Sequence, residues 1–162
     1  MDSSRKIVTL PVLKRRIARH RKEGQPIAFT NGCFDILHYG HVSYLEAAKK
    51  KDRVLIVGLN SDRSVRAIKG PRRPIVPERQ RAALLAALEC VCYAVLFNEP
   101  TPLNLIKKIR PNVLVKGADW KKSQVAGAAE VESWGGEVRL IKLTQGRSTT
   151  NVIHKVLALK KS

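Results

Sequence analysis

The sequence predicts an α/β fold: a Rossmann-like, doubly wound parallel sheet of five strands with helices on both faces. Short apolar runs alternate with amphipathic stretches along the whole chain. Residues 54–59 are apolar apart from one glycine, as is typical of a strand buried on both faces of a parallel sheet. Because crossovers between parallel strands are right-handed, such alternation builds one sheet covered by helices on both faces.

Each predicted element follows from its local pattern. The strands are the short apolar runs, and we expect them at residues 27–30, 54–59, 91–97, 113–116 and 138–143. The helices are amphipathic stretches with capping signals, and we expect them at residues 10–23, 41–51, 78–89, 101–110, 124–134 and 150–159. Residues 69–77 contain three prolines and a glycine, so we expect a loop there.

Length and composition narrow the class of protein. The 162 residues suit a single domain over residues 1–162, with the basic N-terminal segment 1–24 packed on it as a helix. Lysine and arginine exceed the acidic residues by 31 to 13, and this net charge of +18 favours an anionic partner. No apolar run approaches the ~20 residues of a spanning helix, so we expect no membrane involvement. The three cysteines, an odd number, indicate a reducing cytoplasm.

The most informative motif follows the first predicted strand, where His38, Gly40 and His41 form the pattern H-x-G-H at a helix start. A helix N-terminus offers free N–H groups to a phosphate, and two imidazoles beside it can donate hydrogen bonds to a phosphoryl group that gains charge. The competing interpretation is a zinc site formed by Cys33 and the two histidines. No fourth ligand lies nearby in the sequence, so phosphate binding is favoured.

Other candidates also follow strands, because ligands of such sheets bind beyond the carboxyl ends of the strands. Lys69 begins a loop bounded by glycine and proline, where a lysine can reach a phosphate or remain an ordinary exposed side chain. Trp120 follows the fourth predicted strand. It can stack on a nucleotide base, or it can be an ordinary aromatic residue that packs on the protein surface. Residues 146–150 open the last helix and offer a second phosphate site or ordinary caps. No Walker, G-x-G-x-x-G or G-x-S-x-G motif occurs.

These residues resemble a known family. The run T-N-G-C-F-D-I-L-H at residues 30–38, with G-H-V-S-Y-L at 40–45, V-L-V-K-G at 113–117 and S-T-T-N at 148–151, is similar to the heptose-1-phosphate adenylyltransferases. These belong to the cytidylyltransferase-like nucleotidyltransferases, which carry H-x-G-H on a Rossmann-like fold. The resemblance extends from about residue 12 to residue 157.

The resemblance implies transfer of AMP from ATP to D-glycero-D-manno-heptose 1-phosphate, giving ADP-heptose and pyrophosphate for lipopolysaccharide core or a related glycan. Mg²⁺ would arrive with ATP, and no resident metal is expected. The implied catalytic residues are His38 and His41, at the α-phosphoryl group, and Lys69, which bridges the reacting phosphates. Implied nucleotide-binding residues are Thr30, Asn31, Gly32, Cys33, Phe34, Gly40, Lys116, Gly117, Asp119, Trp120, Ser148 and Thr149. Implied residues for the sugar phosphate are Asp35, Asn60, Asp62, Arg73 and Arg81.

Two alternatives remain open. The nearer one is a cytidylyltransferase that uses CTP and an alcohol phosphate such as glycerol 3-phosphate. Those enzymes carry R-T-E-G-I-S-T-T, whereas this chain has L-T-Q-G-R-S-T-T at residues 143–150, which displaces the arginine. The distant one is a basic nucleic-acid-binding module, which the eight scattered aromatic residues disfavour. We also expect a homo-oligomer, either a dimer or a tetramer.

Overall fold

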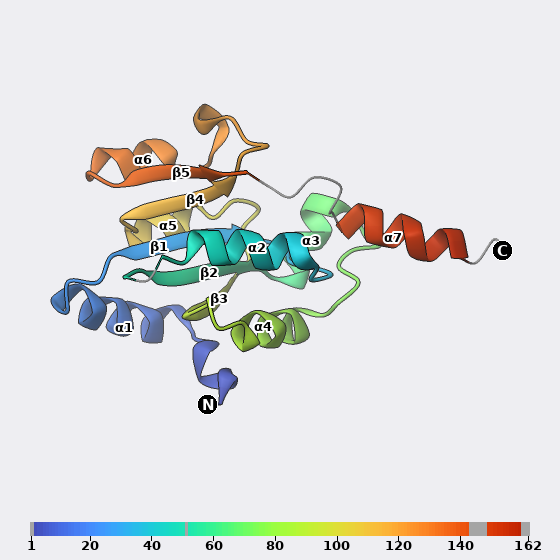
Figure 1. Ribbon diagram of the computed structural model, residues 1–162, viewed down its shortest axis with the longest axis horizontal. Coiled ribbons are helices and arrows are strands. Elements are labelled where there is room, and N and C mark those ends of the chain that lie inside the picture. Colours follow the sequence, from blue (N-terminus) through green and yellow to red (C-terminus); the bar gives the residue numbers. More distant parts are fainter. Residues whose placement is uncertain (1, 51, 143–148, 160–162) are drawn as a thin grey trace.

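A parallel five-stranded sheet with helices on both faces organises the computed structural model, which describes residues 2–50, 52–142 and 149–159. The sheet order is β3-β2-β1-β4-β5 (Figure 1). The strands are β1 (Ile27–Gly32), β2 (Val54–Asn60), β3 (Tyr93–Phe97), β4 (Val113–Gly117) and β5 (Glu137–Ile141). The predicted fold class is therefore confirmed.

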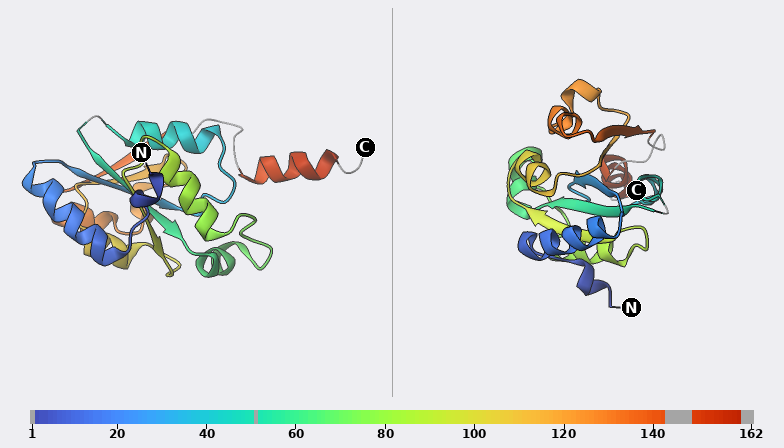
Figure 2. Two further views of the ribbon diagram at one scale, coloured as in Figure 1. Left: turned by 90° about the horizontal axis from the view of Figure 1, so that it is seen from below. Right: turned by 90° about the vertical axis from the view of Figure 1, so that its left-hand side faces the viewer.

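The helices lie on both faces of the sheet, except the last, which extends away from it (Figure 1). They are α1 (Leu10–Lys22), α2 (Tyr39–Ala48), α3 (Asp62–Lys69), α4 (Glu78–Ala87), α5 (Leu103–Ile109), α6 (Ala128–Ser133) and α7 (Thr149–Ala158), with 3-10 turns η1 (Ser3–Lys6) and η2 (Lys122–Gln124). Side chains of α1, α5 and α6 share one apolar cluster, and those of α2 and α4 share the other. The two groups of helices lie on opposite faces of the sheet (Figure 2). The basic helix α1 thus packs on the sheet through Leu13 and Ile17.

The register of the sheet leaves a crevice at its centre. β1 pairs with β2 from Ile27 to Gly32, but with β4 only at Ala28 and Phe29. The chain turns to opposite sides of the sheet on leaving β1 and β4, so their carboxyl ends form the switch point at which ligands bind in such folds. The segments after β1 and β4 border this crevice.

Two helical predictions were wrong. Helix α3 was not predicted, because its eight residues are mostly polar. Its signals are the apolar pair Val65 and Ile68, three residues apart, and Ser61, whose hydroxyl accepts from the Ser64 amide at 3.2 Å. The predicted helix 124–134 is divided into η2 and α6 by Gly127, which has φ +88. A Cβ there would lie 2.7 Å from Cδ1 of Ile106, so the close packing of α5 requires glycine at the break.

Smaller differences concern element ends. β1 continues to Gly32 and β2 to Asn60, so both strands reach the edge of the crevice, whereas β3 begins only at Tyr93. Helix α7 begins at Thr149, buries none of its described side chains, and extends away from the sheet (Figure 1). Among the described residues, no helix is long and apolar enough to cross a membrane.

Candidate active site

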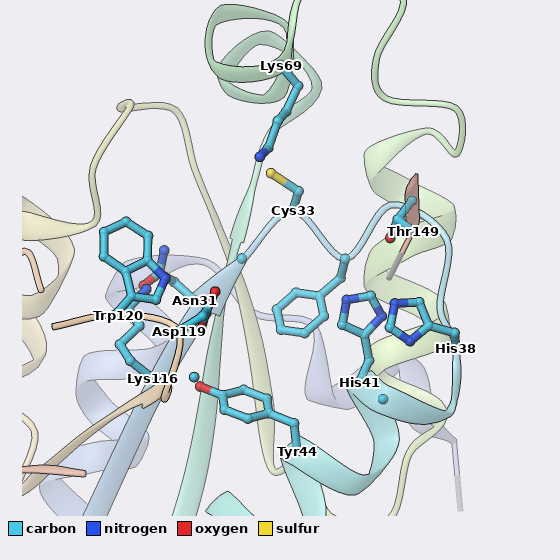
Figure 3. A pocket seen from close by; sticks show the side chains of 14 residues that line it. Asn31, Cys33, His38, His41, Tyr44, Lys69, Lys116, Asp119, Trp120 and Thr149 are labelled. Carbon is cyan, nitrogen blue, oxygen red and sulfur yellow. The ribbon is translucent and has the colours of Figure 1, made fainter. Parts of the chain in front are cut away.

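Two adjoining cavities open at the carboxyl edge of the sheet. The first, here called the histidine cavity, has a volume of about 390 Å³ and contains both histidines (Figure 3). The second, the adjoining cavity, has a volume of about 500 Å³ and lies toward β2 and α3. Most of the wall of the histidine cavity, including Asn31, Cys33 and Lys69, also lines the adjoining cavity, so the two are parts of one cleft in which two ligands can meet.

Most of the predicted site residues meet in the histidine cavity. Those in its wall are Asn31, Gly32, Cys33, Phe34, His38, Gly40, His41, Lys69, Lys116, Gly117, Asp119, Trp120 and Thr149. They come from the ends of β1 and β4, the start of α2, the last residue of α3 and the start of α7. The sequence prediction did not include Tyr44, which also lines the cavity.

The two histidines form a stacked pair at the start of α2. His38 precedes the helix and His41 lies in its first turn, where the His41 amide donates to the His38 carbonyl at 2.9 Å. Their ring centroids are 3.9 Å apart with an interplanar angle of 23°, and the Phe34 ring lies 5.2 Å from His41 on a tilted plane. The pair therefore occupies a fixed place at a helix N-terminus.

His41 is neutral in this environment. Burial, with a smaller contribution from repulsion by His38, lowers its pKa to about 4. Its Nδ1 is buried and has no hydrogen-bond partner among the described residues. A neutral imidazole can donate one N–H to a phosphoryl oxygen, so His41 can stabilise charge that develops in a transition state.

The β4 side of the cavity carries a partly buried cation. Lys116 donates from Nζ to Oδ1 of Asn31, and the same Nζ lies 5.8 Å from the centre of the Trp120 ring. Burial lowers the pKa of Lys116 to about 8, while Asp119 acts in the opposite direction. Trp120 is 47% exposed and stands at the mouth of the cavity, where a base can stack on it (Figure 3).

Lys69 reaches over the cavity from the end of α3. Its ammonium group points toward the Cys33 thiol at the boundary of the two cavities (Figure 3). Burial raises the pKa of Cys33, although Lys69 opposes this effect, so the thiol stays protonated at neutral pH. The three cysteines of the chain are free thiols.

The adjoining cavity contains three of the residues predicted for the sugar phosphate: Asp35, Asn60 and Arg73. The Asp35 carboxylate is occupied by hydrogen bonds within the protein. It accepts from Nε of Arg73 at 2.6 Å and from the Ile75 and Val76 amides at 2.8 Å. Asn60 donates to the Ser64 hydroxyl at 2.9 Å. Arg73, which is partly exposed, lines this cavity together with Lys69 and Lys116.

Three predicted residues, Thr30, Asp62 and Arg81, lie outside both cavities. Thr30 is fully buried and bonds through its hydroxyl to the Tyr44 hydroxyl at 2.7 Å. Arg81 is also 0% exposed, and it donates to the Val76, Cys33 and Asn60 carbonyls and to Oδ1 of Asp62. The structure therefore places the Arg81 guanidinium beneath the site, bound to the loops that border it. Ser148 lies outside the described residues.

Tyr44 was missed because it reads as an ordinary core residue. It follows His41 by three positions, so it lies on the same face of α2, below the histidine pair. Its spacing from the H-x-G-H motif is the only sequence signal for it.

The described ranges contain no group of three or more His, Cys, Asp or Glu side chains placed to hold a metal ion.

Comparison with known proteins gives a consistent picture. Residues 29–156 match the family model described as cytidylyltransferase-like. The chain is 54% identical over 151 residues to the bifunctional protein HldE of Methylobacillus flagellatus, covering 93% of this chain and 31% of that protein. It is 53% identical over 156 residues to that of Trichlorobacter lovleyi, covering 96% of this chain and 32% of that protein. The chain thus spans about a third of the length of these curated relatives.

A solved structure is also similar. The lipopolysaccharide core biosynthesis protein from Thermoplasma volcanium GSS1 superposes with a TM-score of 0.60 at 28% sequence identity. The match covers 76% of this chain and 100% of that one.

Proposed function

Because the chain belongs to the cytidylyltransferase-like family, we propose that it transfers AMP from ATP to a heptose 1-phosphate, giving ADP-heptose and pyrophosphate. The observation that carries this proposal is the histidine cavity, where a stacked histidine pair at a helix N-terminus meets Lys69, Lys116 and an exposed tryptophan. The extended similarity to the HldE proteins supports the choice of ATP and of a heptose phosphate.

The chemistry asks the protein to bring two anions together. An oxygen of the sugar phosphate attacks the α-phosphorus of ATP, and the bond to the pyrophosphate leaving group breaks. Since the nucleophile is already an anion, no strong base is needed, and the site must orient the reactants and neutralise charge. The cations of this site serve both needs.

We assign ATP to the histidine cavity. There the base stacks near Trp120, Lys116 faces the phosphates, and the two imidazoles donate to the α-phosphoryl oxygens. The start of α7 at Thr149 offers a second helix N-terminus for the outer phosphates, and Lys69 bridges to the second substrate.

The sugar phosphate is assigned to the adjoining cavity, where Arg73 and Lys69 provide the charge. Asp35 acts there by holding Arg73 and the loop at residues 75–76. This places the acceptor phosphate beside Cys33, at the boundary that the two cavities share.

Magnesium is proposed to enter with its substrate, as MgATP. Asp119 is the carboxylate of the histidine cavity, and Asp35, in the adjoining cavity, is fully engaged by its own loop. A hydrated Mg²⁺ held mainly by the triphosphate suits this donor set. A reducing cytoplasm, where the three thiols would stay free, and a homo-oligomeric state remain predictions.

The test is pyrophosphate release from ATP with a panel of sugar 1-phosphates, run beside CTP with glycerol 3-phosphate. We expect ATP with a heptose 1-phosphate to give the highest kcat/KM. Equal or faster turnover with CTP would assign the chain to the cytidylyltransferases. Salt-sensitive binding to DNA or RNA without any turnover would instead favour the nucleic-acid-binding alternative.

A further inference from the structure

Phe34 has a backbone conformation that a bulky residue seldom adopts. Its φ is +44, in the left-handed region, although its side chain is aromatic and 6% exposed. Such a conformation persists where the surrounding structure enforces it, and it is often found at functional sites.

Hydrogen bonds from residues distant in sequence hold both neighbours of Phe34 in place. The Cys33 carbonyl accepts from Nη1 of the buried Arg81 at 2.5 Å. The Asp35 carboxylate accepts from Nε of Arg73 and from two backbone amides of the same loop. The turn is thus fixed at the residue before and the residue after Phe34.

The turn directs the Phe34 ring against His41. The ring centroids are 5.2 Å apart, within the range of aromatic contacts, and the planes are tilted by 57°. The ring also lies close to Gly32, where an added Cβ would be 3.0 Å from Cε2 of Phe34. Gly32 therefore leaves the space that the ring fills.

We propose that Phe34 is a positioning residue, whose ring holds the imidazole of His41 in its stack with His38 so that both face the reacting phosphoryl group in one arrangement. Arg81 and Asp35 act through it by fixing the turn. The inference rests on the proposed function for its kinetic consequence, since misplacing a catalytic group by ~1 Å can cost ~10²-fold in rate.

The experiment compares Phe34→Ala with Phe97→Ala. Phe97 is equally buried, at 6% exposed, but packs in the opposite apolar cluster and lines neither cavity. We expect both variants to lose stability, but only Phe34→Ala to lose kcat, by about tenfold or more, with the KM for ATP within about threefold. Phe34→Leu, which keeps apolar volume, should lie between Phe34→Ala and wild type.

A second readout does not depend on activity. The ring protons of His38 and His41 should give a nuclear Overhauser effect in the wild type, since their centroids are 3.9 Å apart. This signal should weaken in Phe34→Ala and persist in Phe97→Ala. Unchanged kcat, or an unchanged signal, in folded Phe34→Ala would overturn the proposal; if that variant does not fold, the same results in Phe34→Leu decide. A wild type that turns over no substrate would count against the proposed function, and the NMR comparison would still decide the role of Phe34.

Discussion

Lys116, near the end of β4, donates a hydrogen bond from its ammonium group to the side-chain carbonyl of Asn31, at the end of β1. The bond crosses the crevice where pairing between these two strands has stopped. It holds a cation at the switch point of the sheet, where burial makes that cation easier to deprotonate. A charge fixed there meets an anionic substrate without first losing side-chain freedom.

This bond leads to a prediction about pH. With a pKa of about 8, Lys116 is charged at pH 7 and loses its proton as the pH rises through 8. The KM for ATP should therefore rise between pH 7 and pH 9, by about threefold or more, as the favourable charge disappears. In Lys116→Met the KM should be high at both pH values. A wild-type KM that stays flat over this range would separate Lys116 from nucleotide binding.

The histidine pair gives the most direct test of the active site. His41→Ala should lower kcat by about 10²-fold or more, because a hydrogen-bond donor to the developing charge is lost. The control is His20→Ala: His20 bonds to the Tyr93 hydroxyl at 2.8 Å, outside both cavities. Its kcat should stay within about twofold of wild type. Circular dichroism should show that both variants are folded. A near-normal kcat in His41→Ala would mean that His41 takes no part in the reaction.

We expect replacement of Arg81 to lower mainly the stability of the fold. Arg81→Met removes a fully buried cation and leaves Asp62 and three carbonyls without their donor. The free energy of unfolding in urea should fall by about 3–5 kcal/mol. Arg79→Met, on the exposed face of the same helix, should change it by less than about 0.5 kcal/mol. Equal effects of the two substitutions would mean that the buried network adds little.

The fold could be predicted because its strands and most helices have strong periodic signals. The apolar run at residues 54–59 predicts a buried strand, and β2 includes all of these residues. Helix α3 was not predicted, because its eight residues are mostly polar and its apolar pair, Val65 and Ile68, is too short a pattern to stand out in the sequence. The break at Gly127 depends on contact with α5, which is distant in sequence.

The same limit applies to the site. Residues that follow strands could be located, because parallel strands bring their carboxyl ends to one edge. Whether such a residue faces a ligand or supports its neighbours depends on contacts across the fold. Arg81 and Asp35 are charged residues beside the site, yet their groups are bound within the protein. Tyr44 reads as core, yet it faces the cavity because Thr30 holds its hydroxyl there.

Lys69 allows its role in binding to be separated from its role in catalysis. It is the last residue of α3, it is exposed, and its ammonium group points to the boundary between the two cavities (Figure 3). If it bridges the two substrates mainly in the transition state, Lys69→Ala should lower kcat and kcat/KM together, by about tenfold or more. If it holds only ground-state phosphate, KM should rise while kcat is kept. Lys69→Arg should rescue in part, because a planar guanidinium is not a compact ammonium.

The matched control for Lys69 is Arg66→Ala. Arg66 is an exposed cation one turn earlier on the same helix, and it lines neither cavity. At fixed magnesium and ionic strength its kcat and KM should stay within about twofold of wild type. Parameters equally flat in Lys69→Ala would make Lys69 an ordinary solvated side chain, because a bridge between two anions cannot be removed without a kinetic effect. If kcat falls in Lys69→Ala but not in Arg66→Ala, and Lys69→Arg is intermediate, the cause is the position of the Lys69 charge. The overall positive charge of the chain would then not explain the effect.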